Sequence, residues 1–314
     1  MTSIPTVTDA APVGRFAPSP SGRMHLGNVL AALIAWCEVR SRGGTMLLRS
    51  EDLDPERCSR AYYEQIKDDL LWLGLDWDEE SPAQSTRSAA YAREFEKLEA
   101  LGLIYPCYCS RSEVHAASAP HASDGTYVYS GKCRELTPAQ RAAQKRRPAW
   151  RVRVPDERFV IEDGIQGRYE ENLLYDCGDF VVRRADGVYA YQLAVVTDDA
   201  QSGVTQVVRG QDLLSSSPRQ AYLYRTLGYP VPEFCHIPLL YAPDGSRLSK
   251  RDRALDLGVL RQRFRPEQLL GLLASAAGLT KAALPVSAGE LAAGFSRETL
   301  AGKQAVYLPA ELME

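Results

Sequence analysis

Two short stretches, far apart in the sequence, carry side chains that suit phosphate chemistry. Residues 14–28 predict a buried strand, a tight Pro-Ser loop and a helix that begins near His25-Leu26-Gly27-Asn28. Backbone N–H groups at a helix start are unpaired and carry partial positive charge, so they attract phosphate oxygens. Residues 247–251, Arg-Leu-Ser-Lys-Arg, form a basic loop after the turn at Gly245. A lone histidine at a helix start is usually structural and a basic loop is usually solvated surface, so only the combination is informative.

The two stretches, in this order, resemble the two signatures of class I aminoacyl-tRNA synthetases. The H-I-G-H signature appears as residues 25–28, and the K-M-S-K-S signature appears as residues 247–251. Asn28 replaces the second histidine, and Arg247 and Arg251 replace the outer Lys and Ser, while Ser249 and Lys250 are intact. Residues 15–22 (Arg-Phe-Ala-Pro-Ser-Pro-Ser-Gly) and 49–54 (Arg-Ser-Glu-Asp-Leu-Asp) further resemble the glutamate-specific branch and its short paralogues. The resemblance extends from about residue 14 to about residue 256. Residues 14–28 contain neither the G-x-G-x-x-G pattern of a dinucleotide-binding loop nor the G-x-x-x-x-G-K-[ST] pattern of a Walker loop.

The resemblance implies a reaction and a set of site residues. ATP with Mg²⁺ would activate L-glutamate to glutamyl-adenylate, and the glutamyl group would pass to the queuosine base at the wobble position of tRNA(Asp), independently of the tRNA 3′ end. The catalytic face would then receive the anticodon stem-loop. The implied catalytic residues are His25 and Lys250; the ATP site adds Gly27, Asn28 and Ser249; the glutamate site comprises Arg15, Ala17, Ser19, Glu51, Tyr191 and Arg209.

Three cysteines between residues 105 and 134 predict a structural zinc site. Cys107 and Cys109 are too close for an easy disulfide but can place two thiolates on one metal, and Cys133 adds a third. Ligand preference alone favours His115 or His121 as the fourth ligand. The family pattern, Cys-x-Cys followed by Tyr-x-x-x-Cys, instead implies Tyr129, which we adopt with His121 as the alternative. Three unrelated buried thiols are the competing interpretation.

Other functions compete with this interpretation. A compact glutamyl-tRNA synthetase would charge a tRNA 3′ end, and a catalytically silent paralogue would only bind RNA or glutamate. A small-molecule nucleotidylyltransferase is disfavoured by the Ser249-Lys250 loop and by the glutamate-site residues. The arginines and lysines between Arg141 and Arg153 predict local contacts with RNA phosphates. The competing interpretation is an exposed helix and sheet edge with no RNA contact.

Composition limits the class of protein. The 314 residues carry a net charge of −3, so no global basic signature for nucleic acid exists. No apolar run is long enough to span a bilayer, and residues 1–12 lack the features of a signal peptide. We therefore expect a cytoplasmic monomer with no membrane partner, whose seven cysteines are reduced or metal-bound.

The pattern of strands and helices that position these residues, together with the family resemblance, predicts an α/β fold: a Rossmann-type class I synthetase catalytic domain. The expected parts are a disordered tail (1–12), the first half of the nucleotide-binding fold (13–104), a zinc-binding insertion with the basic segment (105–155), the second half (156–253) and a helical C-terminal segment (254–314), with no anticodon-binding domain. Strands are expected at 46–49, 150–154, 180–182, 189–191 and 237–241, and residues 205–212 are expected to form a strand that ends in a loop. Helices are expected at 62–73, 91–101 and 218–227. Because ligands bind at the carboxyl ends of parallel strands, Ala17, Ser19 and Glu51 should meet there.

Overall fold

The structure is a computed structural model that describes residues 10–110, 112–113, 128–246 and 255–313. The predictions for Ser249, Lys250, His115 and His121, and for most of the N-terminal tail, lie outside these residues.

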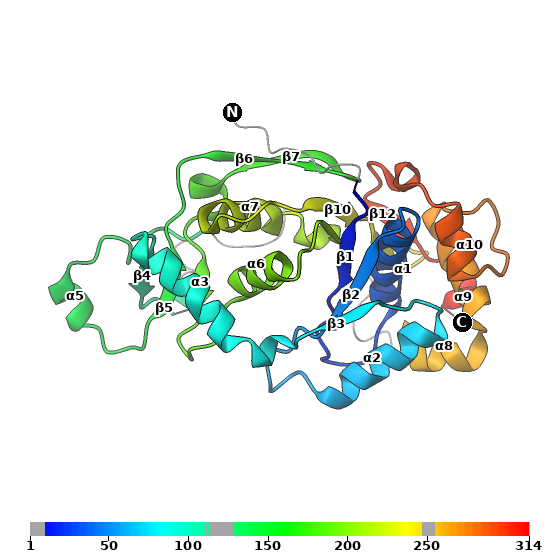
Figure 1. Cartoon of the computed structure of the whole chain (residues 1–314), viewed down its shortest axis with the longest axis horizontal. Coiled ribbons are helices and arrows are strands. Elements are labelled where there is room, and N and C mark those ends of the chain that lie inside the picture. The colour runs from blue at the N-terminus through cyan, green and yellow to red at the C-terminus, as the bar shows by residue number, and fades with distance from the viewer. Residues whose placement is uncertain (1–9, 111, 114–127, 247–254, 314) are drawn as a thin grey trace.

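Parallel strands form the centre of the molecule and confirm the predicted α/β class (Figure 1). Strands β1 (Val13–Phe16), β2 (Thr45–Arg49) and β3 (Glu79–Ser81) form one parallel group in the order β1-β2-β3, and β9 (Gln206–Gly210) pairs with β10 (Glu233–Ile237) in parallel. The two groups meet edge to edge, because the Thr205 amide donates to the Val13 carbonyl at 2.9 Å.

The meeting line of β1 and β9 is a topological switch point. From β1 the chain crosses through helix α1 (Leu26–Arg40) to β2 on one side, and from β9 it crosses through α7 (Ser216–Leu227) to β10 on the other. Loops leaving such a point diverge and open a crevice at the carboxyl ends of the strands. The backbone topology alone therefore predicts a ligand site in the crevice at the carboxyl ends of β1 and β9.

Helix α1 is buried on nearly every side. Its buried residues run from Leu26 to Val39 with no polar face, which is typical of a helix enclosed by the core. Gly14 on β1 allows its close approach, since a Cβ there would lie 2.4 Å from Val39 Cγ2. The rigid placement of α1 fixes its N-terminus at the crevice.

Further helices with described bounds are α2 (Arg60–Trp72), α3 (Ser88–Ala100), α5 (Pro138–Ala142), α6 (Tyr191–Gln201), α8 (Leu257–Arg263), α9 (Pro266–Ala277) and α10 (Ala288–Ala293). Shorter helical turns span Gln84–Thr86, Leu173–Cys177, Gln211–Leu213, Arg297–Leu300 and Ala310–Leu312.

An antiparallel part interrupts the parallel fold. Strands β4 (Ile104–Cys107), β5 (Ala149–Val152) and β8 (Val181–Arg183) form one sheet, and β6 (Arg158–Asp163) pairs with β7 (Gly167–Asn172) as a hairpin. In Figure 1, β4, β5 and α5 lie at one end of the long axis, and α8, α9 and α10 lie near the other.

The C-terminal segment is more than helical. Strand β12 (Ala305–Tyr307) pairs in parallel with β11 (Leu239–Tyr241). Residues of α9 and α10 and the buried Leu312 belong to the same hydrophobic cluster as α1. The segment therefore completes the core around the central helix.

Two predicted strands were wrong in detail. In the predicted strand 189–191, Tyr189 forms only an isolated bridge with Arg183, and Tyr191 begins α6, because three residues are too few to separate strand from helix periodicity. The predicted strand 237–241 is divided at Pro238 into β10 and β11, since proline has no N–H for a ladder.

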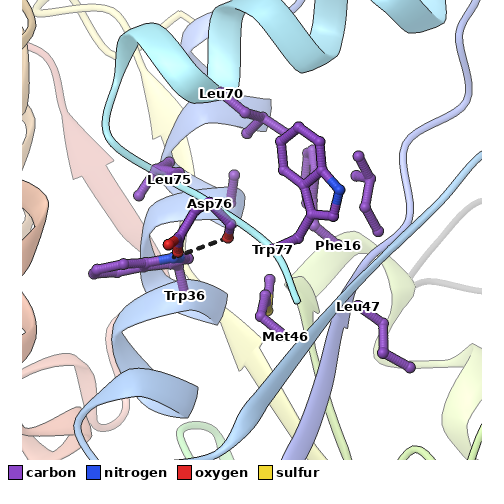
Figure 2. Close-up of a pocket in the computed structure, with 10 residues that line it drawn as sticks. Phe16, Trp36, Met46, Leu47, Leu70, Leu75, Asp76 and Trp77 are labelled. Carbon is purple, nitrogen blue, oxygen red and sulfur yellow. Dashed lines mark hydrogen bonds between the residues drawn. The ribbon is translucent and has the colours of Figure 1, made fainter. Parts of the chain in front are cut away.

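A small hollow in the core is a packing feature. Its volume is about 10 Å³, and Figure 2 shows Trp36 and Trp77 beside it, with the Trp36 Nε1–H donating to the Asp76 carbonyl at 3.0 Å and to its carboxylate at 2.9 Å. Such a volume holds about one water at most. Among the described residues, no helix is both long enough and apolar enough to cross a membrane.

Candidate active site

A cavity of about 950 Å³ lies at the carboxyl ends of β1, β2, β9 and β10. It is large enough for a nucleotide together with an amino acid. Every predicted ATP-site and glutamate-site residue that the structure describes lines it: Arg15, Ala17, Ser19, His25, Gly27, Asn28, Glu51, Tyr191 and Arg209. The structure thus brings together residues that span almost 200 positions of sequence.

His25 caps helix α1 at the cavity. Its Nδ1 accepts the Gly27 amide at 3.1 Å, and the Asn28 side chain accepts the His25 amide at 3.4 Å, which makes a capping box. Because Nδ1 accepts, a neutral His25 carries its proton on Nε2. A Cβ at Gly27 would lie 3.0 Å from the His25 ring, so a larger residue there would push the ring from its capping position. Asn28, the departure from the family signature, therefore keeps a structural role at the cap.

Glu51 and Arg15 are held by a chain of buried charges. The Arg49 guanidinium reaches Glu51 at 3.1 Å and Asp199 at 2.6 Å, and Asp199 also contacts Arg15 at 3.4 Å. Arg49 is 1% exposed and Arg15 is 5% exposed. Charges removed from water in this way are costly unless paired, so the chain fixes both cavity residues in place.

Glu51 has an altered acidity. Burial raises its pKa above the ordinary value, and the neighbouring Arg49 and Arg15 offset part of that effect. Burial also raises the pKa of Tyr191, at the start of α6, while Arg209 acts in the opposite direction. Perturbed carboxyl and phenol groups around one cavity are typical of a functional site.

Arg209 is a buried guanidinium whose hydrogen-bond partners among the described residues are all uncharged. Its Nε donates to His236 Nε2 at 2.9 Å, Nη1 donates to the Gln220 amide oxygen at 2.9 Å, and Nη2 donates to the Ser217 hydroxyl at 2.8 Å. Arg209 is 5% exposed, and burial lowers its pKa. A charged group in this setting attracts an anionic ligand.

Sequence reasoning missed the residues that support the cavity. Arg49, Asp199, His236 and Asp163 had no assigned role, although they hold Arg15, Glu51 and Arg209. A usable signal was present: a histidine inside the apolar strand Phe234-Cys235-His236-Ile237 requires a buried partner.

The three predicted zinc-ligand cysteines converge. The sulfur atoms of Cys107, Cys109 and Cys133 all lie within 4.8 Å of one another. The Tyr129 hydroxyl lies 3.4 Å from Cys107 Sγ and accepts the Cys133 amide at 2.8 Å. Burial, together with the neighbouring Cys107, raises the pKa of Cys109 to about 12, a cost that a divalent cation would offset. Soft sulfur donors at this spacing fit zinc.

The basic segment divides into two groups. Arg151 lies 3.8 Å over the Tyr129 ring and donates to the Asp179 carbonyl at 2.6 Å, and Arg153 pairs with Glu135 at 2.8 Å. Arg151 thus packs on the cysteine cluster, and Arg153 lies 4.9 Å over the ring of Tyr105, which belongs to the same buried cluster. Lys145 and Arg147 are exposed.

Comparison with known proteins agrees with this geometry. Residues 13–275 match the family described as tRNA synthetases class I (E and Q), catalytic domain. A glutamyl-Q tRNA(Asp) synthetase from Nitratidesulfovibrio vulgaris is 44% identical over 96% of this chain and 97% of its own length. One from Symbiobacterium thermophilum is 47% identical over 95% and 96%, and one from Neisseria meningitidis is 50% identical over 80% and 86%.

The chain belongs to the glutamyl-Q tRNA(Asp) synthetase family.

Solved structures agree with this membership. A glutamate tRNA ligase from Elizabethkingia meningosepticum, crystallised with its amino acid, has a TM-score of 0.80 and 27% identity, covering 97% of this chain and 68% of that chain. A methionyl-tRNA synthetase from Mycobacterium tuberculosis, at TM-score 0.55 and 13% identity over 83% of this chain and 63% of its own, shares the fold alone. The predicted class I catalytic domain is thereby confirmed.

Proposed function

We propose that this protein activates L-glutamate with ATP and transfers the glutamyl group to the queuosine base at the wobble position of tRNA(Asp). The observation that carries the proposal is Arg209, a buried cation whose bonded partners in the described ranges are neutral, in the same cavity as Glu51 and the N-terminus of α1. The names of the relatives, at 44–50% identity, supply the acceptor.

Glutamate is selected by opposite charges. Arg209 receives the side-chain carboxylate, with Tyr191 beside it, and Glu51 receives the α-ammonium group. Arg15, Ala17 and Ser19 complete the pocket. Four of the five Arg209 N–H groups already have protein acceptors, so the guanidinium attracts the carboxylate mainly through its charge, which glutamine would forfeit.

ATP binds where α1 begins. His25, Gly27 and Asn28 would face the phosphates, whose bound Mg²⁺ is held mainly by phosphate oxygens and water. The glutamate α-carboxylate attacks the α-phosphorus in line, forming glutamyl-adenylate and releasing pyrophosphate. Positioning and charge stabilisation supply most of the rate, and family resemblance gives Ser249 and Lys250 the task of neutralising the developing charge.

Zinc would be held by Cys107, Cys109, Cys133 and Tyr129. Four protein ligands close the coordination shell, so the metal would stabilise the small loop-rich insertion and supply no chemistry. Metal analysis of the purified chain is expected to find about one zinc per molecule, and Cys133→Ser is expected to lose it. Retention of zinc by that variant would contradict the ligand set.

Labelled glutamate transfer tests the function directly. The acceptors are tRNA(Asp) with queuosine, the same tRNA without it, and tRNA(Glu), with glutamate-dependent ATP–pyrophosphate exchange measured in parallel. Label on the queuosine-containing tRNA alone is the expected result. Label on tRNA(Glu) would make the protein a compact glutamyl-tRNA synthetase, and absence of both label and exchange would make it a binding protein.

A further inference from the structure

The Arg209 guanidinium is held without being neutralised. Four of its N–H groups donate hydrogen bonds, to the His236 ring, the Gln220 amide oxygen, the Ser217 hydroxyl and the Leu213 carbonyl at 3.3 Å. Among the described residues, no carboxylate forms an ion pair with it. A carboxylate in direct contact would satisfy its charge and compete with any anionic ligand.

A carboxylate nevertheless contacts Arg209 indirectly, through the imidazole ring of His236. Asp163, at the end of β6, contacts His236 Nδ1 at 2.5 Å, and both groups are fully buried. An arginine Nε–H can only donate, so His236 Nε2 must accept from Arg209. The ring proton therefore lies on Nδ1 and is donated to Asp163, which fixes the tautomer.

Asp163 is itself fixed from three sides. Its Oδ1 accepts the backbone amides of Ile165 at 3.0 Å, Gln166 at 2.9 Å and His236 at 3.0 Å. The turn of the β6–β7 hairpin thereby docks on β10. The Gly164 amide also donates to the Phe234 carbonyl at 2.8 Å, and Gln166 Nε2 donates to the His236 carbonyl at 2.8 Å, so several contacts hold the hairpin turn against β10.

We propose that Asp163 and His236 are positioning residues that orient Arg209 and keep its charge available for the substrate's distal carboxylate. The inference rests on the proposed function for the identity of that carboxylate. The negative charge of Asp163 partly offsets the charge of the buried Arg209 without contacting it. The neutral His236 imidazole accepts the hydrogen bond from the Arg209 Nε–H. This Asp163–His236–Arg209 relay thereby determines how strongly the site distinguishes glutamate from glutamine.

The Asp163→Asn substitution tests the tautomer. An asparagine that turns its amide nitrogen toward Nδ1 makes Nδ1 an acceptor and moves the ring proton to Nε2, where it opposes the Arg209 N–H. The dissociation constant for glutamate, measured by calorimetry, is expected to rise about tenfold or more, as for other partners that orient a binding group. The KM for ATP in pyrophosphate exchange should stay within about twofold, and inhibition by glutamine should strengthen relative to glutamate.

His236→Gln provides the conservative comparison. A glutamine oxygen can replace the Nε2 acceptor but has no tautomer, so this variant should bind glutamate better than His236→Leu does. In the His236→Gln background, Asp163→Asn should have much less effect than in the native chain, because only the imidazole transmits it. Glu162→Gln is the matched control, since Glu162 neighbours Asp163 on β6 but is 63% exposed and pairs with Arg168.

The outcomes separate the relay from the function. Native exchange with unchanged glutamate binding in Asp163→Asn overturns the relay and leaves the proposed function standing. Additive effects in the double variant also overturn it, because Asp163 would then act only on the fold. Glutamate binding without exchange in the native chain would remove the proposed function while calorimetry still tests the relay. A native chain that binds no glutamate would overturn both.

Discussion

At the scale of single residues, the site depends on which buried charges are paired. Arg49 touches Asp199 at 2.6 Å and Glu51 at 3.1 Å, while the groups that Arg209 bonds within the described part of the chain are neutral. The first arrangement stabilises, because each ion compensates another out of water. The second reserves charge for a ligand.

Replacing Arg49 should unfold the site. Arg49→Met removes the cation that Glu51 contacts and leaves Asp199 with the longer contact to Arg15 at 3.4 Å, and we expect the free energy of unfolding to fall by about 3–5 kcal/mol. Arg60→Gln is the control, because Arg60 is 93% exposed and its loss should change stability by less than about 0.5 kcal/mol. Denaturant titration compares the two variants, and equal stability would contradict the role of Arg49.

His236 should make stability depend on pH. Burial lowers its pKa, Asp163 raises it and the cations Arg209 and Arg15 lower it, with a net decrease from 6.5. The unfolded chain therefore binds a proton near pH 6.5 that the folded chain does not, so acidification below about pH 6.5 should reduce the free energy of unfolding. The slope for one proton is at most about 1.4 kcal/mol per pH unit.

The control for this pH dependence is His236→Gln, which has no proton to exchange. Its unfolding free energy between pH 7 and 5 should fall less steeply than that of the native chain. Asp163, whose pKa is lowered despite burial by its contact with His236, acts at lower pH, below its ordinary value of 3.8. Identical slopes in the two proteins would show that His236 does not titrate differently on folding.

At the scale of elements, the start of α1 combines a helix cap with a phosphate site. His25→Asn should keep the cap, since asparagine is among the best N-cap residues, whereas His25→Ala should lose about 1 kcal/mol of stability. Both variants lack the imidazole, so both should lose pyrophosphate exchange. Thermal unfolding and exchange measured together separate the roles, and near-native exchange in His25→Asn would remove the chemical one.

The exposed part of the basic segment belongs to acceptor binding on our interpretation. Replacing Lys145 and Arg147 with glutamine should leave exchange intact, weaken transfer to tRNA and reduce its salt dependence, because each phosphate contact releases counterions. Arg151→Gln is the comparison, since Arg151 stacks on Tyr129 and should instead reduce zinc retention. Equal loss of exchange and transfer in the first variant would refute the RNA contact.

At the scale of the whole molecule, the C-terminal segment completes the core of the nucleotide-binding fold. Leu273 on α9 is fully buried in the cluster that contains α1, whereas Leu284 is 69% exposed. Leu273→Ala should cost about 2–5 kcal/mol of unfolding free energy, and Leu284→Ala less than about 0.5 kcal/mol. Because α1 carries His25, loss of α9 packing should also reduce exchange. A Leu273→Ala variant with native stability would show that the segment is separable.

The sequence by itself determined the α/β class, the strand–loop–helix around His25, the cysteine cluster and the set of cavity residues. The first three depend on local signals, namely hydrophobic periodicity, Pro and Gly positions and motifs of fixed spacing, whereas the set of cavity residues came from the resemblance to the synthetase family. The predictions of short elements were wrong because local signals need several residues to be informative. At 189–191 and around Pro238, too few residues are available to separate helix, strand and turn.

Only the tertiary structure decided which groups support the site. Arg49 meets Asp199 across 150 positions, and His236 meets Asp163 across 73. No local pattern encodes those pairings, because they arise where separate strands and a hairpin tip converge at one switch point. The free energy of a buried charge depends on its nearest neighbours in space, and those neighbours are fixed only when the chain folds.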